Sequence, residues 1–278
     1  MPKYVPLNPK EHGPKRWGKV PSYAFAANQS VAPVLLEELP HVLPTMPLAF
    51  LQRSEATTQG GYELVALLSA TPGLNLYVTP DGRWLGGYMP AAFRGYPFRL
   101  LQQRNDDKVR HFLCFDEDSG LLADPAEPNG QPFFNDDATL AQGVENVLQF
   151  PKLQEQGRVV TQHAVDLLAE HELIEAWPLN IQNAEGESQP VSGLFRIKEA
   201  ALKGVTADAL KTLQEGNALS LAYAQLFSQH RLKSFSRLYD LRKKLLESKK
   251  NKPNGKPEEI SIDEIFGETN DDLIRFNS

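Results

Sequence analysis

The stretch from Trp84 to Phe98 constrains the fold of this 278-residue chain more than any other segment. It holds five aromatic residues, three glycines and two prolines in fifteen positions. Regular helices and central strands do not tolerate that mixture, because proline removes a backbone donor and glycine weakens both kinds of element. The sequence therefore predicts an irregular segment between strands, which we call the aromatic passage. Such a segment either plugs a core or lines a pocket.

Segments with strand character lie on both sides of the aromatic passage. They are Pro47–Gln52, Tyr62–Ser69, Leu74–Thr79, Tyr96–Gln103 and Val109–Asp116. Turn-forming residues separate them, as in the proline-led turn Thr79–Gly82. We predict an antiparallel β-meander of about five strands in the N-terminal half. A short helix over about 32–39 should precede it, since Pro33 suits a first helical turn.

The second half of the chain shows mainly helical periodicity. Apolar residues from Leu140 to Leu148 recur on one helical face after Asp137, which is a favourable N-cap. The further predicted elements are a helix over 156–172, a β-hairpin over 174–197 and helices near 206–214, 218–229 and 232–247. The expected fold class is α+β, with the meander followed by helices, the hairpin and a C-terminal helical segment.

Composition divides the chain into three parts. Residues 1–30 read as an extended N-terminal arm, and 31–246 as a single domain that is β-rich over 45–118 and helix-rich over 137–246. Seven Lys or Arg in 242–256 are followed by seven Asp or Glu in 258–272. Such charge runs are usually disordered, so 247–278 is predicted to be a solvated tail, with binding of a protein partner as the alternative.

Charge, hydropathy and cysteine content exclude several function classes. A net charge of −6 argues against nucleic acid as the main partner. No run approaches 18 apolar residues, so no membrane insertion is expected, and without an apolar leader the expected location is cytoplasmic. The single cysteine, Cys114, rules out an intrachain disulfide and a cysteine-based zinc site, and it reads as a buried apolar residue.

The sequence offers few groups for catalysis. It has no nucleophile elbow or phosphate-binding loop, and His163 and His171 lie about 12 Å apart on a helix, too far to share an ion. We therefore predict no metal and no cofactor. The carboxylates Asp116, Glu117 and Asp118 end a strand, where they either act as acid, base or cation ligand or form an acidic turn that caps backbone groups.

The aromatic passage gives the main binding hypothesis. Its candidate ligand contacts are Trp84, Tyr88, Tyr96 and Phe98, which could stack on an aromatic or planar ligand, and Arg94, which would supply a charge. Asp116 and Glu117 complete the candidate set. The alternative is a core plug, in which the glycines allow close backbone approach.

Several motifs in this order and spacing resemble the SapC family, which is named for an S-layer-associated gene product. They are Pro21–Ala27, Pro33–Pro40, Asn75–Val78, Asp81–Trp84, Tyr88–Pro90, Tyr96–Phe98, Cys114–Glu117, Gly193–Phe195 and Leu221–Ser228. The resemblance covers about residues 15–240. The tail beyond about 246 looks like an addition.

The resemblance implies a role in the uptake or modification of a nutrient or peptide. Members are often encoded in bacteria beside flavin-dependent tryptophan halogenases, iron/2-oxoglutarate hydroxylases and TonB-dependent outer-membrane receptors. We therefore expect an accessory protein that binds an aromatic or peptide ligand, or a partner enzyme, rather than an enzyme. An enzyme using Asp116, Glu117 or Asp118, and an adaptor or S-layer export component acting through the tail, are the alternatives.

Overall fold

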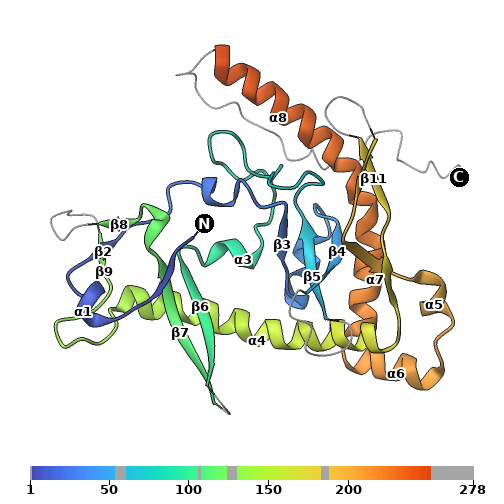
Figure 1. The fold of residues 1–278 in the computed structure, drawn as a ribbon, viewed down its shortest axis with the longest axis horizontal. Coiled ribbons are helices and arrows are strands. Elements are labelled where there is room, and N and C mark those ends of the chain that lie inside the picture. The colour runs from blue at the N-terminus through green and yellow to red at the C-terminus, as the bar shows by residue number, and fades with distance from the viewer. Residues whose placement is uncertain (1, 54–60, 106–107, 124–129, 183–187, 252–278) are drawn as a thin grey trace, which may run out of the picture.

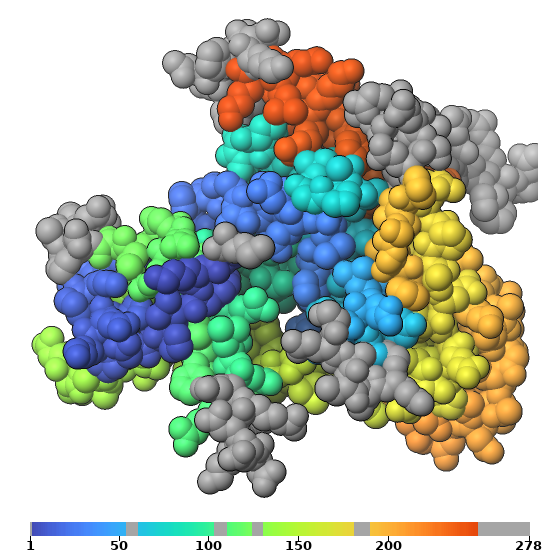
Figure 2. All heavy atoms as spheres, in the orientation of Figure 1, coloured from blue at the N-terminus to red at the C-terminus, as the bar shows by residue number. Residues whose placement is uncertain are grey.

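A computed structural model describes residues 2–53, 61–105, 108–123, 130–182 and 188–251, shown in colour as a ribbon in Figure 1 and as spheres in Figure 2. Within them the strands pair antiparallel and helices dominate the C-terminal part, so the predicted α+β class is confirmed. Two sheets lie side by side along the long helix α4, Gln142–Glu170 (Figure 1). None of the described helices is both long enough and apolar enough to cross a bilayer.

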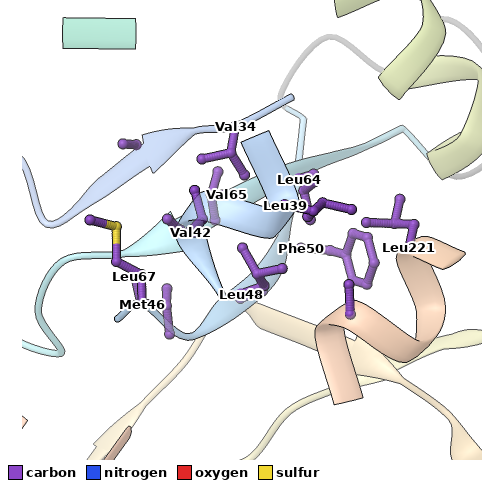
Figure 3. Close-up of a cluster of buried hydrophobic side chains, with 14 of the residues drawn as sticks. Val34, Leu39, Val42, Met46, Leu48, Phe50, Leu64, Val65, Leu67 and Leu221 are labelled. Atoms are coloured by element: carbon purple, nitrogen blue, oxygen red, sulfur yellow. The ribbon is translucent and has the colours of Figure 1, made fainter. Parts of the chain in front are cut away.

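The larger sheet has the strand order β10-β13-β4-β5-β3. Its strands are β3 Val31–Pro33, β4 Leu48–Gln52, β5 Tyr62–Leu67, β10 Ile174–Ala176 and β13 Leu194–Ile197. Leu48 and Phe50 on β4, together with Leu64 on β5, pack against Val42 of α2 and Leu221 of α7, and all five side chains are buried (Figure 3). This main core forms because strands from both halves of the chain bury their apolar faces together.

The smaller sheet has the order β1-β7-β6, with β1 Tyr4–Pro6, β6 Phe98–Asn105 and β7 Lys108–Asp116. One face covers a second core of five buried side chains. They are Trp17, Phe98, Phe115, Phe133 and Val144. The rings of Trp17 and Phe98 meet edge to face with their centroids 4.9 Å apart, an arrangement that favours the pair beyond simple area burial.

The predicted continuous meander is wrong, because its strands belong to two sheets. β5 pairs with β4 on one edge and with β3 on the other, so neither edge remains for β6. The predicted strand Leu74–Thr79 contains only an isolated bridge between Val78 and Trp84. The side chain of Asn75 accepts locally from the N–H of Tyr77, which competes with a strand ladder, and donates to the distant carbonyl of Ala26.

The predicted helix over 32–39 is also wrong. This segment forms β3, then the 3₁₀ turn η2, Leu36–Glu38, and the short helix α2, Leu39–Val42. β3 takes the free edge of β5, and that tertiary pairing overrides the local helical tendency.

One helix, α4, replaces the two helices predicted over the middle of the chain. It begins after the N-cap Ala141 rather than at Asp137, and it continues through Pro151. An internal proline costs about 3 kcal/mol, so tertiary contacts must offset that cost. They are present, because the Gln154 amide donates to the carbonyl of Ala91 and Phe150 packs near Gly95.

The segment expected as an extended arm, residues 1–30, carries short elements of its own where it is described. These are β1, α1 Pro9–His12, β2 Arg16–Trp17 and η1 Ala24–Ala26. β2 pairs with β8, Leu122–Ala123, and with β9, Gln131–Pro132. The division of the chain into an arm and a single domain stays a prediction.

The predicted hairpin and C-terminal helices are confirmed. β11 Leu179–Gln182 pairs with β12 Ser188–Val191, outside which β10 pairs with β13. The described elements that follow are α5 Glu199–Lys203, α6 Ala207–Glu215, α7 Ala218–Ser228, η4 Gln229–Lys233 and α8 Ser234–Asn251. The tail predicted over 247–278 lies outside the described residues beyond the end of α8.

Candidate functional site

Most of the aromatic passage points inward. Phe93, on the short helix α3, Ala91–Arg94, and Phe98 are each only 4% exposed. The half-buried Trp84 stacks on the buried ring of Tyr77, 5.6 Å between centroids, and its Nε1 donates to the carbonyl of Tyr88 at 3.0 Å. These contacts are those of a core plug, so Trp84 and Phe98 stabilise the fold.

Tyr88 and Arg94 differ, because they reach the surface. The exposed guanidinium carbon of Arg94 lies 5.1 Å from the ring centroids of both Tyr88 and Phe150. His41 stacks on Tyr88 with 5.1 Å between centroids. We call these four residues the Arg94 platform. Cation–π contacts of this kind contribute about 0.5–1 kcal/mol at exposed sites, and two of them fix the plane of the guanidinium.

A buried carboxylate supports the Arg94 platform from below. Glu38 is 4% exposed, and its two oxygens accept from the backbone N–H of Leu35 at 2.9 Å, that of Ala91 at 2.6 Å and the hydroxyl of Tyr88 at 2.9 Å. Arg94 in turn donates from Nη2 to the Tyr88 hydroxyl at 2.7 Å. A chain of hydrogen bonds therefore links a surface cation to a buried anion through one tyrosine.

The same contacts perturb the tyrosine. Burial and the adjacent Glu38 carboxylate raise the pKa of Tyr88 to about 12. Tyr88 thus keeps its proton at neutral pH and stays the donor to Glu38. Its hydroxyl positions Arg94 and is not a general base.

Tyr96 and Asp116 form a second, separate group. The ring of Phe25 stacks on Tyr96 with 3.9 Å between centroids, and the Tyr96 hydroxyl donates to Asp116 Oδ2 at 3.0 Å. Asp116 Oδ1 accepts from the backbone N–H groups of Lys3 at 2.7 Å and Asp118 at 3.2 Å. Asp116 is 2% exposed and caps the 3₁₀ turn η3, Glu117–Ser119, so its oxygens are used structurally.

Glu117 is held by cations from the N-terminal segment. Lys3 Nζ lies 2.9 Å from Glu117 Oε2, and Lys15 Nζ lies 3.5 Å from Oε1. The hydrogen bond from Lys3 lowers the pKa of Glu117 below its usual range. The buried His12 Nε2 is 3.8 Å from Glu117 Oε1. Burial lowers the pKa of His12 and favours the neutral ring there.

The structure therefore divides the candidate residues into two groups of contacts. Arg94 donates to Tyr88, which donates to Glu38, whereas Tyr96, Asp116 and Glu117 tie the end of β7 to the N-terminal segment. Among the described residues no three His, Cys, Asp or Glu side chains are grouped closely enough to hold a metal ion. At the surface, the first group presents a cation next to aromatic rings.

A comparison with protein-family models adds a second line of observation. The model of the SapC family matches residues 7–235, which is well over half of the chain. The chain belongs to the SapC family. The searches of curated proteins and of solved structures found no match.

The SapC match includes the first group of contacts and the second group except Lys3, and it ends at the start of α8. Family membership is what the motifs in the sequence indicated, and it is confirmed. Sequence reasoning missed His41 and Phe150, which complete the Arg94 platform, and Glu38, which supports it. Glu38 lies within the motif Pro33–Pro40, but its partners Tyr88 and Ala91 lie 50 and 53 positions further along the chain.

Proposed function

We propose that this SapC-family protein is an accessory protein that binds a ligand carrying a carboxylate beside an aromatic ring. One observation supports this above the others: an exposed guanidinium held between two aromatic rings. The described contacts give Arg94 one hydrogen bond, and a guanidinium has five N–H donors in a fixed fork. The remaining donors fit a ligand carboxylate, while the rings of Tyr88, His41 and Phe150 offer faces for stacking.

Within that class we propose a free aromatic amino acid, with tryptophan as the first choice, or a peptide that contains one. The family resemblance supports this choice, because tryptophan halogenases are among the enzymes often encoded beside SapC proteins. The protein would hold or hand over a nutrient during uptake or modification in the cytoplasm. Asp116 and Glu117 serve the fold in this proposal and take no part in catalysis.

Calorimetric titration of the full-length protein with L-tryptophan tests the proposal. Arg94→Gln should weaken binding by at least about tenfold, since a hydrogen bond to a charged group contributes about 1.5–3 kcal/mol. Arg99→Gln is the matched control, because Arg99 is another exposed arginine that lies over a tyrosine ring, 5.7 Å from the centroid of Tyr4. It should leave binding unchanged.

Tryptamine, which lacks the carboxylate, should bind far more weakly than L-tryptophan to the unmodified protein. If L-tryptophan shows no binding heat, or if Arg94→Gln and Arg99→Gln bind it equally, the proposed site is wrong. Far-ultraviolet circular dichroism of both variants confirms that the fold is kept, so that a loss of binding reports on the site.

A further inference from the structure

A concave site lies between the smaller sheet and α4, outside the Arg94 platform. It is a cavity of about 530 Å³, within the usual size range of small-molecule sites. Its apolar wall is made largely of leucines. They are Leu7, Leu100, Leu113, Leu140 and Leu148. None of them is fully buried, so these side chains keep apolar surface that a ligand could cover.

The strand register makes one end of the cavity apolar and the other end polar. Leu100 pairs with Leu113 on the neighbouring strand, and two residues further along Gln102 pairs with His111. Gln102 also donates to Glu155 of α4. The wall therefore changes from leucine to polar side chains over about 7 Å of strand, and the polar end faces the 152–156 turn of α4.

The polar end has an unbalanced positive charge. Glu155 is already neutralised, because Arg158 donates to both of its oxygens, at 2.9 and 2.6 Å. Lys152, exposed at the same end, has no ion-pair partner among the described residues. His111 lies beside it in the lining. A ligand group that pairs with Lys152 at this end is therefore an anion.

We propose that this cavity binds a single-chain amphiphile with a carboxylate head, namely a medium-chain fatty acid. The alkyl chain lies along the leucines, and the carboxylate pairs with Lys152. Leu148 and Gln156 are about 12 Å apart along the axis of α4, which limits the chain length that the cavity covers. This site is independent of the aromatic ligand proposed above, and the two can be tested separately.

Titration of the full-length protein with hexanoate, octanoate and decanoate, each below its micelle concentration, tests the assignment. One equivalent should bind, and each added methylene should tighten binding about fourfold until the cavity is filled. Decanol, which has the same chain without the charge, should bind at least tenfold more weakly than decanoate. Added salt should weaken decanoate binding and leave decanol unaffected.

Two pairs of variants separate the head group from the chain. Lys152→Glu should weaken decanoate binding at least tenfold, whereas Lys211→Glu, which changes an exposed lysine on α6, should not. Leu148→Trp should fill the cavity and abolish binding. Leu153→Trp is its control, since Leu153 lies on the same helix and is 61% exposed outside the cavity lining.

Equal affinities for decanoate and decanol, or an unchanged affinity in Lys152→Glu, would overturn the assignment of the head group. Binding with no saturation, or equal binding by the two tryptophan variants, would overturn the site itself. Concentration-dependent dimerisation that Leu148→Trp alone abolishes, without uptake of decanoate, would show that a second copy of the chain covers the cavity. Circular dichroism of every variant must match that of the parent protein.

Discussion

Replacement of Glu38, the buried carboxylate that supports the Arg94 platform, should destabilise the fold. Replacing Glu38 by Gln keeps the size of the side chain and turns one acceptor oxygen into an amide that donates. Depending on which oxygen it replaces, that amide would face either the N–H of Leu35 or both the N–H of Ala91 and the hydroxyl of Tyr88. A buried donor left unsatisfied costs about 1–3 kcal/mol, so Glu38→Gln should lower the free energy of unfolding by that amount.

Glu38→Ala should cost more, because all three donors lose their acceptor. Tyr88 is half-buried and can turn to water, whereas the N–H of Ala91 lies in a residue that is 3% exposed. We expect a loss of about 3–5 kcal/mol, from the two backbone donors together with the cavity that the missing methylenes leave. Such a loss is a large fraction of the 5–15 kcal/mol typical of a whole domain.

Urea denaturation monitored by circular dichroism measures both effects. Glu37→Gln is the matched control, since Glu37 is the exposed neighbour of Glu38 on the same 3₁₀ turn, and it should change stability by less than about 0.5 kcal/mol. The reasoning would be refuted by a Glu38→Gln variant as stable as Glu37→Gln. It would also fail if Glu38→Ala lost less than about 1 kcal/mol.

Three further outcomes follow from the second group and from the core plug. Tyr96→Phe removes the hydroxyl donor to the buried Asp116 and should cost about 1–3 kcal/mol in urea denaturation. Because the pKa of Glu117 is lowered in the folded state, its contact with Lys3 adds stability above about pH 4.5 that is lost as pH falls below that value. Glu117→Gln should therefore flatten the acid limb of the stability curve between about pH 5 and 3. Trp84→Ala should lower the free energy of unfolding by about 3–5 kcal/mol, and a loss under 1 kcal/mol would contradict its place in the core.

The predictable parts of the fold were those set by local signals. Helices α6 and α7 and the hairpin β11–β12 follow apolar periodicity and turn residues that lie within each element. The irregular nature of the aromatic passage was equally local, since proline and glycine exclude regular structure wherever they stand. These elements can be predicted without knowing which residues pack against them.

The unpredictable parts depended on partners far along the chain. β4 pairs with β13, more than 140 residues later, and nothing in either segment specifies that pairing. Two helices were predicted where α4 is continuous through Pro151, and the hydrogen bond from Gln154 to the carbonyl of Ala91 is one of the tertiary contacts on that part of the helix. Such long-range contacts decide between local alternatives that are close in free energy.

The candidate site was also only partly predictable from the sequence. Tyr88 and Arg94 were visible because aromatic and cationic residues in one irregular segment are unusual. Glu38 was not, because the sequence does not distinguish it from its neighbour Glu37, which is exposed, and burial is a property of the assembled structure.

Glu38 also explains why the aromatic passage can serve as both core plug and binding surface. The carboxylate of Glu38 supports the core because it accepts from the backbone N–H groups of Leu35 and Ala91. Its hydrogen bond to the Tyr88 hydroxyl fixes that ring, and the ring with Phe150 fixes the plane of Arg94. Holding the guanidinium in one orientation lowers the entropy lost when a ligand carboxylate binds. An apolar residue at position 38 would leave the N–H groups of Leu35 and Ala91 without this acceptor and would also release the Tyr88 hydroxyl, so the carboxylate serves both the core and the surface.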